Sequence, residues 1–395
     1  MNPSERLDRI PPYIFAEIDK KIDAAKAKGY DIISLGIGDP DTPTFPHIVK
    51  AMHESIDDAS THNYPPYQGT KDFRKACADW MKKRYNADLD AETEVLALIG
   101  SKEGIAHVFL AFIDPGDYTL VPDPAYPVYR NATYLAGGTP YFMPINPENN
   151  YLPDLDKIPE EIAKKAKLIF LNYPNNPTGA VANLEYFKKV LEFAKKYNIL
   201  ICHDQAYCEM TYDGYIAPSF FELEGAKDYC LEFFSHSKTY NMTGWRIGWV
   251  AGGAKLMKPL SVIKNNIDSG AFKAIQNAGI VALETPQSEI NKLNEIYKRR
   301  RDIMVNGLRK LGWQIEDLKA TFYMWLPVPE GMTSVEFVEI MLEKAHLVVP
   351  PGTGYGDKGE GFFRIALTVE EDKLKEALQR MQKAGITYNM TKEAV

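Results

Sequence analysis

Lys167-Leu-Ile-Phe-Leu-Asn172 and Asn198-Ile-Leu-Ile-Cys-His-Asp204 are two short, mostly apolar runs, and the amphipathic stretch Leu184 to Tyr197 lies between them. Consecutive apolar residues, rather than alternating ones, are typical of strands buried on both faces of a mainly parallel sheet. A strand, a helix and a second strand in this order form a βαβ unit. Ligands of such sheets bind at the carboxyl ends of the strands, so we expect the functional residues there.

The alternation of strands and helices continues on both sides of this unit. On the amino-terminal side we expect two pairs of a strand and a helix: Val95 to Ile99 with Lys102 to Ile113, and Tyr118 to Val121 with Ala125 to Ala136. On the carboxyl-terminal side we expect two further strands, Tyr229 to Ser235 and Trp245 to Ala251. This order predicts an α/β fold whose large domain is built on a mainly parallel sheet flanked by helices.

The pattern changes from about Ser288, where a long charged helix is predicted over Glu289 to Leu311 with apolar residues along one face. Four elements follow, in the order strand, helix, strand and helix: Thr321 to Pro327, Ser334 to Lys344, Phe362 to Leu367 and Glu371 to Lys383. They predict a second, smaller α+β domain.

The opening residues, helical from Pro12 to Lys28 and extended from Asp31 to Leu35, are too few to form a core alone. We expect them to pack on the carboxyl-terminal unit. The predicted organisation has three parts: an amino-terminal segment 1–45, a large domain 46–288 and a small domain 289–395.

Composition and charge exclude several classes of protein. Apolar residues make up 45% of the 395 residues and charged residues 25%, which is ordinary globular composition. The net charge of -7 argues against general electrostatic binding to nucleic acid. No apolar run approaches the roughly 18 residues of a membrane span, and the amino terminus has no signal-peptide pattern. Four cysteines are too few for a secreted disulfide framework, so we expect a cytoplasmic protein without membrane or nucleic-acid partners.

A lysine and an aspartate follow two of the predicted strands. Ser235-His-Ser-Lys238 comes directly after the mostly apolar run Cys230-Leu-Glu-Phe-Phe, which places Lys238 in a loop at a strand's carboxyl end. Asp204 ends the run that begins at Asn198, so its carboxylate emerges on the same rim. Most lysines are solvated surface charges, but a desolvated lysine has a depressed pKa and becomes a nucleophile able to form a Schiff base.

Two loops join these charges on the rim. Asn172-Tyr-Pro-Asn-Asn-Pro-Thr-Gly179 follows the strand that begins at Lys167, and its Asn, Pro and Gly residues also have an ordinary explanation as a turn. Gly100-Ser-Lys-Glu-Gly104 lies between a strand and a helix, where free backbone N–H groups can cradle a phosphate. Arg246, eight residues after Lys238, could add a guanidinium to that phosphate.

A phosphate cradle, an amide loop, a carboxylate and a buried lysine are the parts that a pyridoxal phosphate site needs. In such a site the lysine holds the aldehyde, the carboxylate keeps the pyridine nitrogen protonated, and amide or phenol groups hydrogen-bond the ring oxygen. We therefore expect pyridoxal 5'-phosphate as the cofactor. Cys202-His203 and Cys208 invite a metal interpretation, but no second pair stands at zinc spacing and we propose no metal.

From about Asp31 to Leu367 the chain resembles the class I aminotransferases of the fold-type I pyridoxal-phosphate superfamily. The resemblance rests on motifs in family order: Asn-Asn-Pro-Thr-Gly, Asp-x-x-Tyr, Ser-x-Ser-Lys with an arginine eight residues later, and a late Phe-Arg-Ile-Ala. It implies a large domain with a seven-stranded, mainly parallel sheet, and transfer of an amino group between an amino acid and a 2-oxo acid.

The resemblance also implies roles for particular residues. Lys238 is expected to form the Schiff base and to move the proton, and Asp204 to pair with the pyridine nitrogen. The remaining cofactor contacts are expected from Tyr207 and Asn176 at the ring oxygen, Tyr126 stacked on the ring, and Ser101, Lys102, Ser235 and Arg246 around the phosphate.

Three further residues are expected to serve the substrate or a neighbouring subunit. Arg364 resembles the arginine that clamps the substrate's α-carboxylate, Gly38 lies in the segment that closes on it, and Asn176 is expected to contact the substrate as well. Tyr64 resembles the tyrosine that reaches the phosphate of the neighbouring subunit, which implies a homodimer. His236 stands where an apolar residue is commoner in the family, and its role stays open.

Within the family, Ile33-Ser-Leu-Gly-Ile-Gly-Asp-Pro-Asp-Thr-Pro-Thr44 and the lysine segment look most like LL-diaminopimelate aminotransferases. The resemblance thus implies transamination of LL-2,6-diaminopimelate with 2-oxoglutarate, in lysine biosynthesis. The alternatives are an aminotransferase for aspartate, alanine or a broad range of amino acids, a pyridoxal-phosphate lyase or decarboxylase, and a non-catalytic protein that binds the cofactor. The last of these would be supported by a DNA-reading module ahead of the fold, for which the first 30 or so residues are too few.

Overall fold

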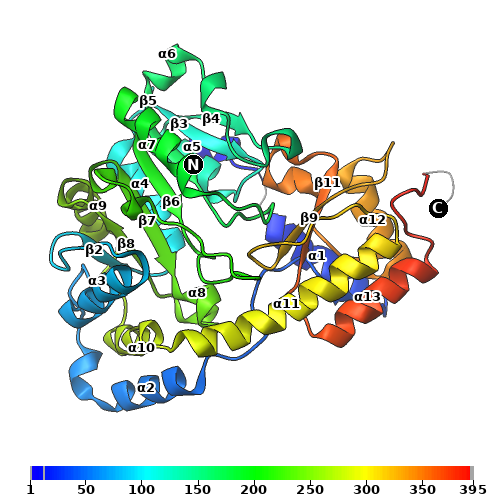
Figure 1. Ribbon diagram of the computed structural model, residues 1–395, viewed down its shortest axis with the longest axis horizontal. Helices are drawn as coiled ribbons and strands as arrows, with labels where there is room; N and C mark the ends of the chain where they lie inside the picture. Colours follow the sequence, from blue (N-terminus) through cyan, green and yellow to red (C-terminus); the bar gives the residue numbers. More distant parts are fainter. Residues whose placement is uncertain (1, 12–13, 392–395) are drawn as a thin grey trace.

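A computed structural model describes residues 2–11 and 14–391 of the chain (Figure 1). Its centre is a seven-stranded sheet with the strand order β2-β8-β7-β6-β5-β3-β4. The strands are β2 (Val95–Leu98), β3 (Tyr118–Asp123), β4 (Thr139–Pro144), β5 (Ala166–Leu171), β6 (Leu200–Asp204), β7 (Cys230–Ser235) and β8 (Gly248–Gly252). Only β8 runs antiparallel to its neighbours in this sheet, so the predicted mainly parallel α/β fold is confirmed.

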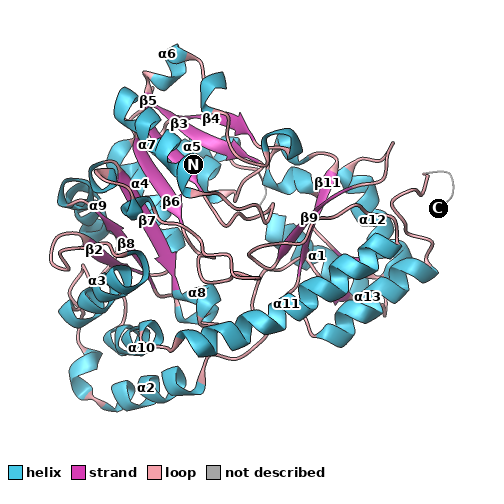
Figure 2. Cartoon of the chain, viewed as in Figure 1, coloured by secondary structure: helices cyan, strands magenta, loops and turns pink. Residues whose placement is uncertain are grey.

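The central strands are buried on both faces, as their apolar runs predicted. In β5, Leu168 and Phe170 belong to one apolar cluster, whereas Ile169 and Leu171 belong to another. This alternation places successive side chains on opposite faces of the sheet. Helices cover both faces (Figure 2): α4 (Ser101–Phe112), α5 (Val128–Ala136) and α9 (Ala254–Ile267) contribute to the first cluster, and α7 (Leu184–Tyr197) to the second.

The region around β2 and β8 has a third apolar cluster. Helices α3 (Lys71–Tyr85) and α10 (Lys273–Leu283) pack there, and α2 (Pro46–Asp57) packs on α10. Helix α3 begins at an N-cap, Thr70, whose side chain accepts a hydrogen bond from the Phe73 N–H, and it ends at Asn86 in the left-handed conformation. Both features satisfy backbone groups that the helix leaves unpaired.

A further group of helices and strands surrounds a fourth apolar cluster. They are α11 (Gln287–Lys310), β9 (Tyr323–Pro327), α12 (Ser334–Ala345), β10 (Leu347–Val348), β11 (Phe362–Ala366) and α13 (Glu371–Lys383). Strands β9 and β11 pair antiparallel, and α11 packs against α13 (Figure 1). Residues Ile33 and Leu35 of the amino-terminal part lie in this cluster, where β1 (Ile33–Ser34) pairs parallel to β10.

The structure corrects several predicted boundaries. The helix expected from Pro12 is α1 (Ile14–Ala27), and positions 12 and 13 lie outside the described residues. Helix α5 starts at Val128 rather than Ala125, after Pro127, and β8 starts at Gly248 because the 3-10 helix Thr243–Trp245 precedes it. Strand β4 was not predicted: it contains two prolines and lies at the edge of the sheet, where missing N–H groups are tolerated.

Among the described residues, none of the helices combines the length and the apolar composition that a membrane span requires.

Candidate active site

A cavity of about 250 Å³ opens at the carboxyl ends of β2, β5, β6 and β7. It is lined by most of the predicted site residues: Gly38, Ser101, Lys102, Tyr126, Asn176, Asp204, Tyr207, Ser235, Lys238 and Arg246. Parallel strands end at the same edge of the sheet, so loops that are far apart in the sequence meet there. The structure therefore brings these residues together as the strand pattern predicted.

Lys238 lies in a short helix, α8 (His236–Thr239), and not in the loop that the sequence predicted. Ser235 ends β7 and also caps this helix, because its hydroxyl accepts a hydrogen bond from the Ser237 N–H at 3.1 Å. The helix turns the Lys238 ammonium into the cavity, where it donates to the carbonyl oxygen of Gly38 at 2.6 Å.

The surroundings of Lys238 favour a neutral amine. Burial lowers its pKa to about 8, and the positive charges of Arg364 and Arg246 act in the same direction, whereas the Asp39 carboxylate opposes the change. A lysine with this pKa has a substantial neutral fraction near pH 8, as a nucleophilic amine requires.

Asp204 ends β6 and is buried, with one paired and one unpaired carboxylate oxygen. The Tyr129 hydroxyl donates to Oδ2 at 2.8 Å, and the Asn172 side chain donates to the Asp204 carbonyl at 2.7 Å. Oδ1 is buried and has no hydrogen-bond partner among the described residues. Burial raises the pKa of this carboxyl to about 6, although the hydrogen bond from Tyr129 lowers it. The Asp204 carboxylate therefore has one oxygen that can accept a hydrogen bond from a ligand.

A phosphate-sized cradle lies where β2 gives way to α4. Gly100 has φ +77°, and a Cβ there would stand 2.1 Å from Nη2 of Arg246, so glycine allows the guanidinium to approach this turn. Ser101 and Lys102 form the amino terminus of a twelve-residue helix, whose unpaired N–H groups favour anions. Arg246 Nη1 donates to the Thr243 carbonyl at 2.8 Å, which fixes the side chain beside the cradle.

Arg364 lies next to the cavity but is not one of the residues that line it. It is fully buried on β11, where Nη1 donates to Asn176 Oδ1 at 2.9 Å and Nη2 donates to the Gly36 carbonyl at 2.6 Å. Its guanidinium carbon lies 4.1 Å from the centroid of the Tyr323 ring. Arg364, the predicted carboxylate-binding residue, thus contacts two residues that line the cavity, Asn176 and Tyr323.

Comparison with known proteins agrees with this geometry. Residues 30–381 match the family model for aminotransferases of class I and II. The chain belongs to this family. The aminotransferase is 57% identical to LL-diaminopimelate aminotransferase 2 of Nostoc sp., over 98% of the chain and 100% of the relative. It is also 57% identical to LL-diaminopimelate aminotransferase of Gloeobacter violaceus, over 98% of the chain and 100% of the relative.

Solved structures show the same architecture. Substrate-bound BacF from Bacillus subtilis matches the aminotransferase with a TM-score of 0.94 and 37% identity, over 99% of the chain and 100% of BacF. Aspartate aminotransferase from Thermus thermophilus matches with a TM-score of 0.91 and 26% identity, over 97% of the chain and 100% of that structure. The predicted fold type and the predicted aminotransferase activity are confirmed.

The family depends on pyridoxal phosphate, and the cavity of this aminotransferase fits that cofactor. The unpaired buried oxygen of Asp204 is an acceptor for a protonated ring nitrogen, and Lys238 offers the amine. Any side chain at position 100 would collide with the Arg246 guanidinium. Because Gly100 has none, the guanidinium and the α4 amino terminus are both accessible to a phosphate.

Three residues at the cavity were not singled out from the sequence. Tyr129 touches Asp204, Asn172 lines the cavity, and the Tyr323 hydroxyl lies 3.1 Å from that of Tyr207. Asn172 could have been predicted, because it directly follows β5 at its carboxyl end, just as Asp204 lies at the carboxyl end of β6. Tyr323 could not, because it lies 116 residues further along the chain, on β9, and no local pattern places it beside Tyr207.

Besides Arg364, two other positions singled out from the sequence lie outside the cavity. Tyr64, expected to serve a neighbouring subunit, is 86% exposed and does not line the cavity of its own chain. His236 is buried, with Nε2 3.2 Å from the Gly279 carbonyl, and its ring lies near those of Phe73 and Tyr240. Burial lowers the pKa of His236 to about 4, so it is a neutral core residue.

Proposed function

We propose that this aminotransferase exchanges the amino group of LL-2,6-diaminopimelate with 2-oxoglutarate, as a step of lysine biosynthesis. The observation that carries the chemistry is the buried Lys238 amine in one cavity with the half-paired carboxylate of Asp204. The choice of substrate is supported by relatives of 57% identity, named LL-diaminopimelate aminotransferase, that are matched along their whole length.

We propose that Lys238 would hold the aldehyde of pyridoxal phosphate covalently, and that its Nζ, once the substrate's amino group has replaced it there and released it as a free amine, would take the proton from the substrate's Cα. Asp204 would hold the ring nitrogen protonated, and Tyr207 and Asn176 would hydrogen-bond the ring oxygen. Bound pyridoxal phosphate supplies an electron sink for the charge that the departing proton leaves behind. Tyr126 would cover the ring. Support comes from the common cavity that these side chains line.

We propose that the phosphate is held by Ser101, Lys102, Ser235 and Arg246. All four line the cavity, and they combine a helix amino terminus, hydroxyl groups and two cationic side chains. Such donors suit a dianion.

The test of this function is the substrate panel. The purified holoenzyme is mixed with single amino acids, including the three diaminopimelate stereoisomers, glutamate, aspartate and alanine, and the change in cofactor absorbance is followed. The LL isomer and glutamate should convert the cofactor to its amino form with the highest kcat/KM. Conversion by aspartate or alanine alone would support one of the other aminotransferase activities, and loss of the substrate's carboxyl group or side chain would indicate a lyase.

We propose that Arg364 and the segment around Gly38 bind the substrate's α-carboxylate. Arg364→Lys keeps a positive charge but loses the planar fork, so KM should rise roughly 30- to 100-fold, about 2–3 kcal/mol, with little change in cofactor affinity. Steady-state kinetics and cofactor titration measure the two effects. Arg299→Lys, at an exposed arginine of α11, is the matched control. Equal loss of substrate and cofactor affinity would argue against a role in substrate binding.

We propose a homodimer in which Tyr64 reaches the neighbouring subunit's phosphate. Tyr64 and Tyr67 are exposed, with 86% and 49% of their surface accessible, and Ile267 and Phe272 add further exposed apolar surface. The loop at Gly270 lies against the Pro66 carbonyl, which places these side chains on neighbouring segments. Sedimentation velocity tests the proposal, because a monomer of 44.6 kDa at micromolar concentration would contradict it.

We propose that the chain divides into a segment 1–45, a large domain 46–288 and a small domain 289–395. The fourth apolar cluster supports this division, because it joins Ile33 and Leu35 to α11, α12 and α13, and of the described residues of the large domain only Tyr207, Met210 and Tyr212 are among its buried members. Limited proteolysis should cut near position 45 and in the short connection 284–286 between α10 and α11 before it cuts inside either domain. We further propose a cytoplasmic location, which the four buried, unpaired cysteines support; fractionation of source cells tests it.

A further inference from the structure

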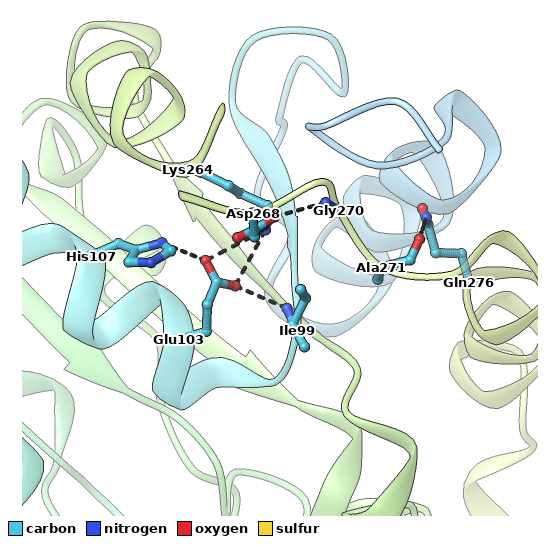
Figure 3. Close-up of polar contacts among 8 residues, drawn as sticks. All are labelled: Ile99, Glu103, His107, Lys264, Asp268, Gly270, Ala271 and Gln276. Atoms are coloured by element: carbon cyan, nitrogen blue, oxygen red, sulfur yellow. Dashed lines mark hydrogen bonds and ion pairs between the residues drawn. The ribbon is translucent and has the colours of Figure 1, made fainter. Parts of the chain in front are cut away.

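A buried lysine outside the cavity forms ion pairs with two segments that lie far apart in the sequence. Lys264 lies on α9 and has no accessible surface. Its ammonium lies 3.0 and 2.9 Å from the two carboxylate oxygens of Asp268, and 3.4 Å from each of those of Glu103 (Figure 3). Taking these charges out of water is costly, so their pairing must be complete for the fold to tolerate them.

Glu103 connects Lys264 to the phosphate cradle. It lies in the first turn of α4, two residues after Ser101, and its Oε2 accepts a hydrogen bond from the Ile99 N–H at 2.9 Å. Its Oε1 lies 2.6 Å from Nδ1 of His107, one turn further along the helix. The Glu103 carboxylate therefore holds the backbone that leads into Gly100, while its negative charge sits one helical turn from the anion site.

Asp268 connects Lys264 to the segment before α3. Its Oδ1 accepts a hydrogen bond from the Gly270 N–H at 2.7 Å. The carbonyl of the next residue, Ala271, accepts a hydrogen bond from the Gln276 side chain at 2.6 Å (Figure 3). Gln276 Oε1 in turn accepts a hydrogen bond from the Thr70 N–H at 2.7 Å. The ammonium of Lys264 thus ties the cradle to the loop that supports residues 65–70.

We propose that Lys264 is a positioning residue for the cofactor's phosphate. Its ammonium offsets part of the negative charge of the Glu103 carboxylate, which would otherwise repel a phosphate dianion more strongly, and it holds the cradle turn against the loop at Asp268. This inference rests on the proposed cofactor site. The ligand atoms of Glu103, His107 and Asp268 lie within 4.8 Å of one another, and Lys264 supplies the cation between the two carboxylates.

The experiment compares two ligands of the apoenzyme, pyridoxal phosphate and pyridoxal, which lacks the phosphate. Lys264→Met removes the charge at nearly constant side-chain length, and Lys258→Met, at an exposed lysine of the same helix, is the control. Lys264→Met should raise the Kd of pyridoxal phosphate about 10- to 100-fold and that of pyridoxal less than about threefold, while Lys258→Met changes neither.

A double variant separates the charge from the packing. Glu103→Gln keeps an oxygen for the Ile99 N–H but removes the negative charge, so Lys264→Met combined with Glu103→Gln should return the Kd of pyridoxal phosphate to within about fivefold of wild type. Equal weakening of both ligands in Lys264→Met, an unchanged Kd, or no recovery in the double variant would overturn the proposal.

Misfolding of the Lys264→Met variant and failure of the proposed cofactor site can each be distinguished from failure of this proposal. Should Lys264→Met lack native circular dichroism, Glu103→Gln alone decides: the proposal expects it to bind pyridoxal phosphate at least as tightly as wild type, and a tenfold weakening would contradict the proposal. A wild-type enzyme that fails to bind pyridoxal phosphate at Lys238 would refute the proposed function itself. Wild-type binding together with an unaffected Lys264→Met variant would refute only the role of Lys264.

Discussion

Lys238→Ala should lose transamination by at least about a thousandfold and should lack the absorbance band of lysine-bound pyridoxal phosphate. Alanine offers neither an amine for the cofactor nor a base for the substrate's Cα proton. The variant should still fold, because Lys238 makes one hydrogen bond, to the Gly38 carbonyl, and its removal takes an ammonium out of a buried site. Visible spectroscopy and single-turnover kinetics measure the two losses.

Exogenous amines give this prediction a positive control. Ethylamine can enter the space that the Lys238 side chain leaves, so it should restore part of the turnover of Lys238→Ala. Lys255→Ala, at an exposed lysine at the start of α9, should behave like wild type. A Lys238→Ala variant that retained both the absorbance band and turnover would show that another lysine carries the cofactor.

Asp204→Asn should lower kcat by roughly a hundredfold to ten-thousandfold while the cofactor remains attached to Lys238. The amide has the same shape and can still accept the hydrogen bond from Tyr129, but it carries no charge to keep the ring nitrogen protonated. Stopped-flow measurement of the half-reaction separates this loss from cofactor binding. Asp213→Asn, at an exposed aspartate, is the control.

The pH dependence of cofactor binding gives a second readout for Asp204. Its pKa in the apoenzyme is raised to about 6 by burial, so the carboxylate is ionised above that pH and protonated below it. A protonated ring nitrogen binds the ionised form, so wild-type affinity for pyridoxal phosphate should fall as the pH drops below about 6. Protonation of Lys238 also weakens binding as the pH falls, so Asp204→Asn should keep that dependence and lack only the additional fall below about pH 6. A variant that kept both wild-type kcat and the pH profile would place the partner of the ring nitrogen elsewhere.

The convergence of Lys238 and Asp204 could be predicted because it depends on strand direction alone. Their apolar runs fixed β6 and β7 as buried parallel strands, and the ends of such strands share one edge. The helix around Lys238 was missed, although Ser235 is a good N-cap residue, because α8 is only four residues long. Strand β4 was missed because its prolines are tolerated only at an edge, which the sequence does not reveal.

Contacts between residues far apart in the chain could not be predicted from the sequence. Tyr323 comes from β9 and lies 116 residues from Tyr207 in the sequence, and the two meet because both pack into the fourth apolar cluster. No sequence feature distinguishes Lys264 from a solvated lysine, because its spacing of four residues from Asp268 is common on exposed helices. Lys264 differs from a solvated lysine because α4 packs against α9 and the side chain is buried. Such burial depends on tertiary packing rather than on local sequence pattern.

Reduction with borohydride tests the central claim most directly. The purified holoenzyme is reduced, digested and mapped by mass spectrometry for the phosphopyridoxyl group. The label should be found on the peptide that contains Lys238, and its yield after incubation of the apoenzyme with pyridoxal should rise with pH around 8, following the lowered pKa of this amine. A label on a different lysine, or no label at all, would contradict the assignment of the site.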